Sequence, residues 1–244
     1  IIFKNTGHKP RVIITIMSKL YVVATPIGNL KDITFRALDV LREADLVLAE
    51  DTRVTQKLLS HYDIKTELFS FHKFSKKSSL RKILNLFEQG KNVALVTDAG
   101  TPGISDPGQY LINRLTYLQI NVDIIPVPGP SALTAILSVA DIDCSQFSFL
   151  GFPPHKKGRK TFFERVAKSG IPVILFESPH RIQKTLRELE NVSGDRYVNI
   201  GRELTKVYEE VFRGILSGAQ KHFVGEKQRG EFVIIISNEQ ILSG

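Results

Sequence analysis

Short apolar segments alternate with loops and with helical patterns along most of this chain. Residues 20–24, 46–49 and 93–96 are apolar at every position, which is typical of strands buried on both faces of a parallel sheet. Residues 66–72 alternate between polar and apolar positions, as expected of an edge strand. Further strands are expected at residues 121–126, 147–150, 172–176, 197–200, 209–213 and 230–236, the last of them central in its sheet.

Helices are expected after most of these strands. Residues 33–44, 109–115 and 182–189 place apolar side chains at helical spacing, so each segment has one face to bury. Up to about residue 139 the order of strand, loop and helix repeats, which predicts a parallel sheet with right-handed crossovers. The strand pattern then changes. Because 244 residues can form two cores of ordinary size, we expect two α/β domains, at residues 17–133 and 134–244.

The composition narrows the class of protein. The chain has 33 basic and 25 acidic residues, and its net charge of +8 favours an anionic partner. The single cysteine, Cys144, excludes an internal disulfide framework and favours a reducing cytoplasm. No apolar run of about 18 residues predicts a transmembrane helix, so we expect no membrane association.

The first sixteen residues differ from the rest of the chain. They carry three cations and no acid, and they precede Met17, the only methionine. We expect Met17 to be the native start and residues 1–16 to be a non-native or disordered extension, outside the fold.

Three loops rich in glycine and proline follow predicted strands, at residues 25–30, 98–108 and 127–132. Ligands of open α/β sheets bind at the carboxyl ends of the strands. Glycines there let a ligand lie against backbone N–H and C=O groups. One such loop is equally well explained as a rigid turn, but three at one sheet edge predict a shared ligand cleft.

Polar segments lie beside these loops. Residues 50–53 place three charges directly after a strand, which fits either a functional cluster or a helix start. Residues 73–82 contain five cations and no acid, next to Phe71 and Phe74, and residues 156–160 contain four cations. Cations with interleaved aromatic rings suit RNA phosphates and a stacked base, although charge runs are also common on solvated helices.

Common catalytic motifs are absent. The chain lacks the Gly-x-x-x-x-Gly-Lys-Ser/Thr motif of nucleoside triphosphate sites and the Gly-x-Ser-x-Gly motif of serine nucleophiles. The Gly-x-Gly-x-x-Gly motif of dinucleotide sites does not follow the first strand. The six histidines have no metal-ligand spacing, so we expect no metal. His72 and His180 both follow strands, where a histidine is more often a local hydrogen-bonding residue than a catalyst.

Taken together, the segments at residues 24–30, 50–53, 98–108, 127–132, 176–181 and 202–206 closely resemble the tetrapyrrole methylase family, in the branch that methylates ribosomal RNA. The resemblance covers the chain from Met17 to its end. It implies two α/β/α domains with the cofactor cleft between them, and a homodimer. The implied reaction is S-adenosylmethionine-dependent 2′-O-methylation of a cytidine in the decoding centre of small-subunit (16S) rRNA, free or in the 30S subunit.

Two departures from the family's other members agree with this branch. Members that methylate tetrapyrroles begin with Gly-x-Gly-Pro-Gly-Asp, where this chain has Ala-Thr-Pro-Ile-Gly-Asn at residues 24–29. Those members also have Gly-Asp-Pro where this chain has Gly-Thr-Pro, at residues 100–102. A tetrapyrrole methyltransferase and a non-enzymatic ribosome-binding protein remain the alternatives. Carried over by position, the implied cofactor-binding residues are Ile27, Asp98, Gly100, Thr101, Ile104, Ser131, Ala132, Glu177, Ser178, Glu203, Leu204 and Thr205.

A ribose hydroxyl is a poor nucleophile, so a general base or a cation should lie near the transferred methyl group. Four residues after strands are candidates for this catalytic role: Asp51, Arg53, His72 and Lys73. The cations expected to contact RNA phosphates are Lys73, Lys76, Lys77, Arg81, Lys156, Lys157, Arg159 and Lys160.

Overall fold

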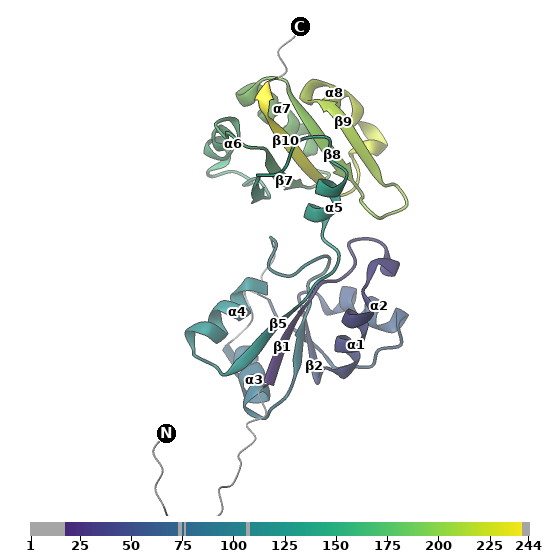
Figure 1. Cartoon of the computed structure of the whole chain (residues 1–244), viewed down its shortest axis with the longest axis vertical. Helices are drawn as coiled ribbons and strands as arrows, with labels where there is room; N and C mark the ends of the chain where they lie inside the picture. Colours follow the sequence, from purple (N-terminus) through teal and green to yellow (C-terminus); the bar gives the residue numbers. More distant parts are fainter. Residues whose placement is uncertain (1–17, 73–74, 76, 106–107, 241–244) are drawn as a thin grey trace, which may run out of the picture.

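A computed structural model describes residues 18–72, 75, 77–105 and 108–240, which form two five-stranded sheets, each with helices on its faces (Figure 1). The first sheet has the order β3-β2-β4-β1-β5, and every pairing in it is parallel. Its strands are β1 (Ser18–Val23), β2 (Leu46–Ala49), β3 (Leu68–Ser70), β4 (Val93–Leu95) and β5 (Val122–Val127). The parallel sheet predicted from the repeat is therefore confirmed, and β3 lies at the predicted edge.

Both faces of the first sheet are buried, which explains why its central strands are apolar throughout. In β2, Val47 packs with Leu41 on one face, while Leu48 packs with Ile83 on the other. Fully burying one such side chain contributes about 1.5–3 kcal/mol. The covering elements are α1 (Phe35–Glu43) and α2 (Thr52–His61) on one face, and α3 (Lys77–Glu88) and α4 (Gly108–Tyr117) on the other (Figure 1). The short helix η1 (Leu30–Asp32) precedes α1 and has no buried residue.

The second sheet is mixed and has the order β6-β7-β10-β8-β9. β6 and β7 are parallel, and the other pairings are antiparallel. The strands are β6 (Ser148–Gly151), β7 (Val173–Glu177), β8 (Arg196–Arg202), β9 (Glu210–Ile215) and β10 (Phe232–Gln240). The expected central strand, β10, lies between β7 and β8, so that prediction is confirmed.

Helices cover the second sheet unequally. One face packs against α6 (Arg159–Ala167), α7 (Ile182–Ser193) and α8 (Leu216–His222), with η2 (Gly225–Gln228) following α8. The other face packs against α5 (Ala132–Ser138), whose Ile136 joins Ile174 and Ile235 in a separate apolar cluster.

The predicted boundary between residues 133 and 134 lies inside α5, which directly follows the last loop of the first sheet. The division into domains stays a prediction, and the expected extension at residues 1–16 lies outside the described residues. No helix in the described part of the chain is long and apolar enough to span a membrane.

Candidate ligand-binding cavity between the two sheets

A cavity of about 500 Å³ is lined by residues from both sheets. This volume lies within the range of small-molecule sites. The first sheet contributes residues that follow β1, β2, β4 and β5, because parallel strands place their carboxyl ends at one edge. The lining residues are Ile27, Glu50, residues 97–101, Ile104, Ser105, Ser131 and Ala132 from the first half, and Phe152, residues 176–179, Gly201, Leu204 and residues 231–233 from the second.

Hydrogen bonds join the three glycine- and proline-rich loops into one surface, which we call the loop wall (residues 25–30, 98–105 and 127–132). Thr25 and Gly100 exchange two backbone hydrogen bonds of 3.0 Å each. The hydroxyl of Thr101 donates to the carbonyl oxygen of Pro130 over 3.0 Å. These bonds hold the loops in fixed relative positions along the cavity.

Gly100 has a conformation that favours glycine, with φ of +82°. A Cβ atom at this position would lie 3.3 Å from Cγ2 of Ile27. The backbone angle therefore favours glycine, and an added Cβ would also require Ile27 to shift by a few tenths of an ångström.

Aromatic and aliphatic side chains form an apolar part of the cavity. The rings of Phe152 and Phe176 meet edge to face, with centroids 5.6 Å apart. Ile27, Phe176 and Leu204 belong to the apolar cluster around α5. Such a surface suits the flat face of a heterocyclic ring, while the loop wall offers polar backbone groups.

Two aspartates near the start of α2, Asp51 and Asp98, differ in their hydrogen bonds and in the direction of their pKa shifts. Asp51 is the N-cap of α2, where it accepts a hydrogen bond from the backbone N–H of Arg53. Its carboxylate also accepts from the Arg53 guanidinium, with a shortest N···O distance of 2.6 Å. The side-chain hydrogen bond with Arg53 is the main reason that the pKa of Asp51 falls from 3.8 to about 2.

Asp98 lines the cavity beside this pair. The backbone N–H of Asp51 donates to Oδ1 of Asp98 over 3.0 Å. Partial burial raises the pKa of Asp98, and the nearby charge of Asp51 adds to the increase. The two aspartates therefore carry different chemistry: Asp51 is fixed as a helix cap, and Asp98 is the more basic carboxylate.

The opposite wall is supported by a buried charged network, which consists of Arg159, Glu177, Arg181, Thr185 and Glu188. The side chain of Glu177 is fully buried, and its carboxylate pairs with Arg181 at 2.8 Å. The Thr185 hydroxyl donates to Glu177 over 2.6 Å and accepts from Arg159 over 2.8 Å. Glu177 is thus committed to holding the segment that carries Ser178 and Pro179.

A tight turn brings Leu204 to the cavity. Glu203 and Thr205 on either side have positive φ angles of +49° and +69°. The amine of Lys206 pairs with Glu203 at 2.8 Å and with Glu231 at 3.0 Å. Leu204 lines the cavity, whereas Glu203 and Thr205 are not among its lining residues.

Known proteins share this sequence pattern and fold. The model for Tetrapyrrole (Corrin/Porphyrin) Methylases matches residues 19–220. The chain belongs to the tetrapyrrole methylase family. This finding confirms the resemblance inferred from the loops.

Named relatives within the family are similar over most of their length. A Thermotoga maritima protein named "Ribosomal RNA small subunit methyltransferase I" is 47% identical over 224 residues, which are 92% of this chain and 100% of the relative. A Bacillus subtilis protein of the same name is 42% identical over 92% of this chain and 78% of its own.

Solved structures of other proteins share the fold at lower identity. A cobalt precorrin-4 methyltransferase superposes with a TM-score of 0.66 at 23% identity, over 95% of this chain and 98% of its own. A diphthine synthase superposes with a TM-score of 0.67 at 14% identity, over 90% of each chain. This chain therefore shares its fold with both proteins.

The structure brings most of the expected cofactor residues of this tetrapyrrole methylase together. Ten of the twelve line the cavity, and Glu203 and Thr205 do not. The sequence analysis did not single out Phe152, Gly201, Glu231 and Phe232, which line it as well. Each of these residues lies at or near the end of a predicted strand, and this was the signal that the sequence offered. Glu231 and Phe232 lie at the start of β10, which the antiparallel pairing places beside the ends of β7 and β8.

The catalytic and RNA-contacting candidates are more scattered. Asp51 and Arg53 lie next to the cavity without lining it, and His72 follows the edge strand β3. Lys73 and Lys76 lie outside the described residues, as does the side chain of Lys77. Four candidates are exposed: Arg81, Lys156, Lys157 and Lys160.

Arg159 does not fit the expected contact with RNA. Its side chain is only 6% exposed and pairs with Glu188 at 2.6 Å inside the charged network. The run of cations at residues 156–160 indicated a solvated basic loop. At Arg159 this interpretation is wrong in this conformation, because the guanidinium is used within the fold.

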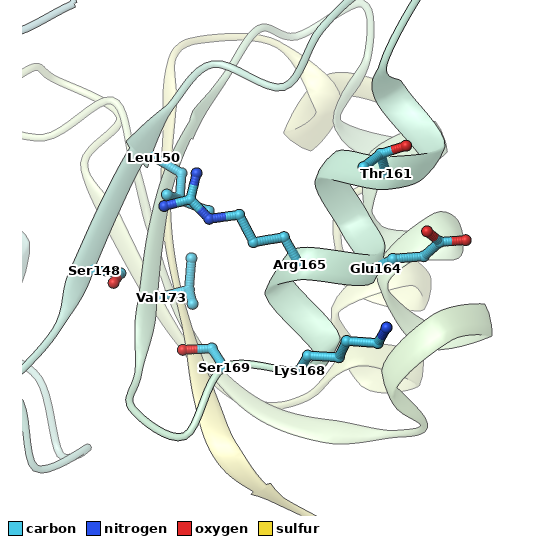
Figure 2. A pocket seen from close by; sticks show the side chains of 8 residues that line it. All are labelled: Ser148, Leu150, Thr161, Glu164, Arg165, Lys168, Ser169 and Val173. Carbon is cyan, nitrogen blue, oxygen red and sulfur yellow. The ribbon is translucent and has the colours of Figure 1, made fainter.

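A second hollow of about 420 Å³ lies between β6 and α6 (Figure 2). Arg165 reaches from α6 toward Leu150, while Lys168 points away from the strand. Both are exposed cations.

Proposed function

We propose that this tetrapyrrole methylase transfers a methyl group from S-adenosylmethionine to the ribose 2′-oxygen of a cytidine in small-subunit rRNA. The observation that carries the proposal is the cavity between the loop wall and the aromatic side chains of the second sheet. Its volume and its mixture of apolar and polar lining suit a nucleoside ligand. Relatives named as small-subunit rRNA methyltransferases favour RNA as the acceptor.

The lining residues fit the parts of S-adenosylmethionine. Ile27, Phe176 and Leu204 offer apolar contacts to its adenine, and the loop wall offers backbone groups to its polar ends. When bound, this cofactor supplies a methyl group already activated on a positively charged sulfur. The protein then has to align that group with the acceptor oxygen and exclude water. We propose that Gly100, Thr101, Ile104, Ser131, Ala132, Glu177 and Ser178 complete its binding site.

The RNA is expected to contact exposed cations on both halves of the molecule. Arg81 lies on α3, and Lys156 and Lys157 precede α6. Phosphate contacts by lysine and arginine make affinity dependent on salt, because binding releases counterions. A substrate of this kind implies a cytoplasmic protein, and we propose that it acts as a homodimer.

The test is methyl transfer to small subunits that lack methylation. Purified protein and labelled cofactor should modify one cytidine, detected as a bond resistant to alkaline hydrolysis. A parallel reaction with a tetrapyrrole should give no transfer. Transfer to the tetrapyrrole alone, or RNA binding without cofactor affinity by calorimetry, would contradict the proposal.

The RNA surface is tested by reversing two charges. The K156E/K157E variant should bind RNA more weakly and show a smaller salt slope than the wild type. The control variant K65E/K91E makes the same change in charge in the segments that precede β3 and β4. These segments lie at the amino ends of the strands of the first sheet, whereas the cavity lies at their carboxyl ends. Equal affinities of the two variants would refute the proposed surface.

A further inference from the structure

We propose that Asp98 is the general base that accepts the proton of the ribose 2′-hydroxyl. The inference rests on the proposed function and adds to it the residue that performs the proton transfer. It follows from the position of Asp98 in the cavity, its single hydrogen bond within the described residues and the commitment of the neighbouring carboxylates.

The order of the strands places Asp98 toward the expected RNA side of the cavity. Asp98 follows β4, which lies between β1 and β2. The loops after β1 and β5 lie to one side of it, and β2 and the edge strand β3 lie to the other. The basic segment with Arg81 follows β3. A nucleotide entering from that side would meet Asp98 before it met the loops after β1 and β5.

Three other carboxylates near the cavity already form ion pairs with cationic side chains. Asp51 caps α2 and holds Arg53, and Glu177 is buried between Arg181 and Thr185. Glu231 pairs with Lys206. Asp98 accepts one backbone hydrogen bond at Oδ1, and within residues 18–72, 75, 77–105 and 108–240 no other hydrogen bond to its side chain is formed. Its Oδ2 is therefore available to accept a hydrogen bond from a hydroxyl group.

The chemistry of the step balances with Asp98 as the base. The 2′-oxygen forms a bond to the methyl carbon while its proton moves to the Asp98 carboxylate. The carbon–sulfur bond breaks, and its electron pair stays on sulfur, which becomes a neutral thioether. Asp98 then returns the proton to solvent. The raised pKa of Asp98 makes it a stronger base than an ordinary aspartate.

The hydrogen bond from Asp51 fixes the orientation of this base. Because Oδ1 is held by the backbone N–H at the start of α2, the carboxylate has one preferred rotation. A catalytic base has to be within hydrogen-bond reach of the proton that it removes, so a fixed orientation favours the reaction.

The experiment compares D98N with the wild type. Asparagine keeps an oxygen for the Asp51 N–H but cannot accept the proton. We expect kcat for rRNA methylation to fall about 100-fold or more, with the KM for rRNA unchanged. Calorimetry of the RNA-free protein should give the same affinity for S-adenosylmethionine within about twofold. The wild-type dependence of kcat on pH should show an acidic limb that D98N lacks.

Two further variants decide between explanations. D39N removes an exposed carboxylate on α1 and should behave as the wild type. E50Q tests the other carboxylate in this part of the cavity and should lose less than tenfold in kcat. Unchanged kcat in D98N, a loss confined to E50Q, or an equal fall in kcat and cofactor affinity in D98N would overturn the inference.

Failure of the proposed function looks different. A wild-type protein that binds the cofactor but never methylates rRNA refutes the function and the inference with it. A wild-type protein that methylates rRNA together with an active D98N variant refutes the inference alone.

Discussion

The two sheets build their sides of the cavity by different means. The loop wall of the first sheet depends on backbone geometry, with reciprocal hydrogen bonds between Thr25 and Gly100 and a glycine at φ of +82°. The second sheet depends on a buried charged network centred on Glu177. A backbone wall is sensitive to added atoms, whereas a charged network is sensitive to the loss of one partner. The comparison predicts which substitutions affect ligand binding and which affect folding.

The largest effect is expected from E177A. It leaves Arg181 and Thr185 without their buried partner, and breaking a buried ion pair costs about 3–5 kcal/mol. Urea unfolding should show this loss. The control E164A removes an exposed carboxylate 3.9 Å from Lys160 and should cost about 0–1 kcal/mol. Equal costs would mean that the network does not stabilise the second half.

In the loop wall, G100A should weaken cofactor binding more than it affects folding. An alanine at this backbone angle costs about 1–3 kcal/mol, and its Cβ would press on Ile27. We expect about a tenfold loss or more in affinity for S-adenosylmethionine by calorimetry. G225A is the matched control, because Gly225 has φ of +58° with no atom within 4 Å of the added Cβ. It should show a similar strain but unchanged affinity.

The same substitution, threonine to valine, can be made in the charged network of the second sheet and in the loop wall of the first. T185V removes a hydroxyl between Arg159 and Glu177, and hydrogen bonds to charged groups contribute about 1.5–3 kcal/mol. T101V removes the bond to the Pro130 carbonyl, worth about 0.5–1.5 kcal/mol. Denaturant unfolding should rank T185V as the more destabilising, and cofactor titration should rank T101V as the more harmful to binding. A reversed order in either measurement would contradict the distinction between the walls.

The smallest effect concerns acid stability at the start of α2. The pKa of Asp51 is lowered to about 2 in the folded protein, mainly by Arg53. A depressed pKa stabilises the fold above the unfolded value of 3.8, and this contribution disappears as the pH falls toward 2. The difference in unfolding midpoint between the wild type and D51N should therefore be larger at pH 6 than at pH 2.5. An unchanged difference would show that Arg53 does not stabilise the charged carboxylate.

Local signals in the sequence were sufficient for the strands and for the loop wall. Apolar runs such as residues 46–49 and the glycine at position 100 depend on neighbours in sequence and on backbone angles. The charged network was not predicted, because Arg159 and Thr185 are 26 residues apart and meet only through packing of α6 on α7. The same limit led to the assignment of Arg159 to RNA. The sequence analysis assigned Asp51 to catalysis and Asp98 to the cofactor, because the cap interaction of Asp51 and the cavity beside Asp98 depend on the folded structure.

Gly28 has a consequence for how the two halves of the protein are spaced. A Cβ at Gly28 would lie 2.3 Å from Cγ of Lys206 and 2.9 Å from Oγ1 of Thr205. The missing side chain therefore sets how closely the first loop of one sheet approaches the turn that carries Leu204 in the other. Any larger residue would act as a wedge between the first loop and this turn and would displace Lys206 from Glu203 and Glu231. One hydrogen atom in place of a methyl group thus sets the spacing between the first loop and this turn.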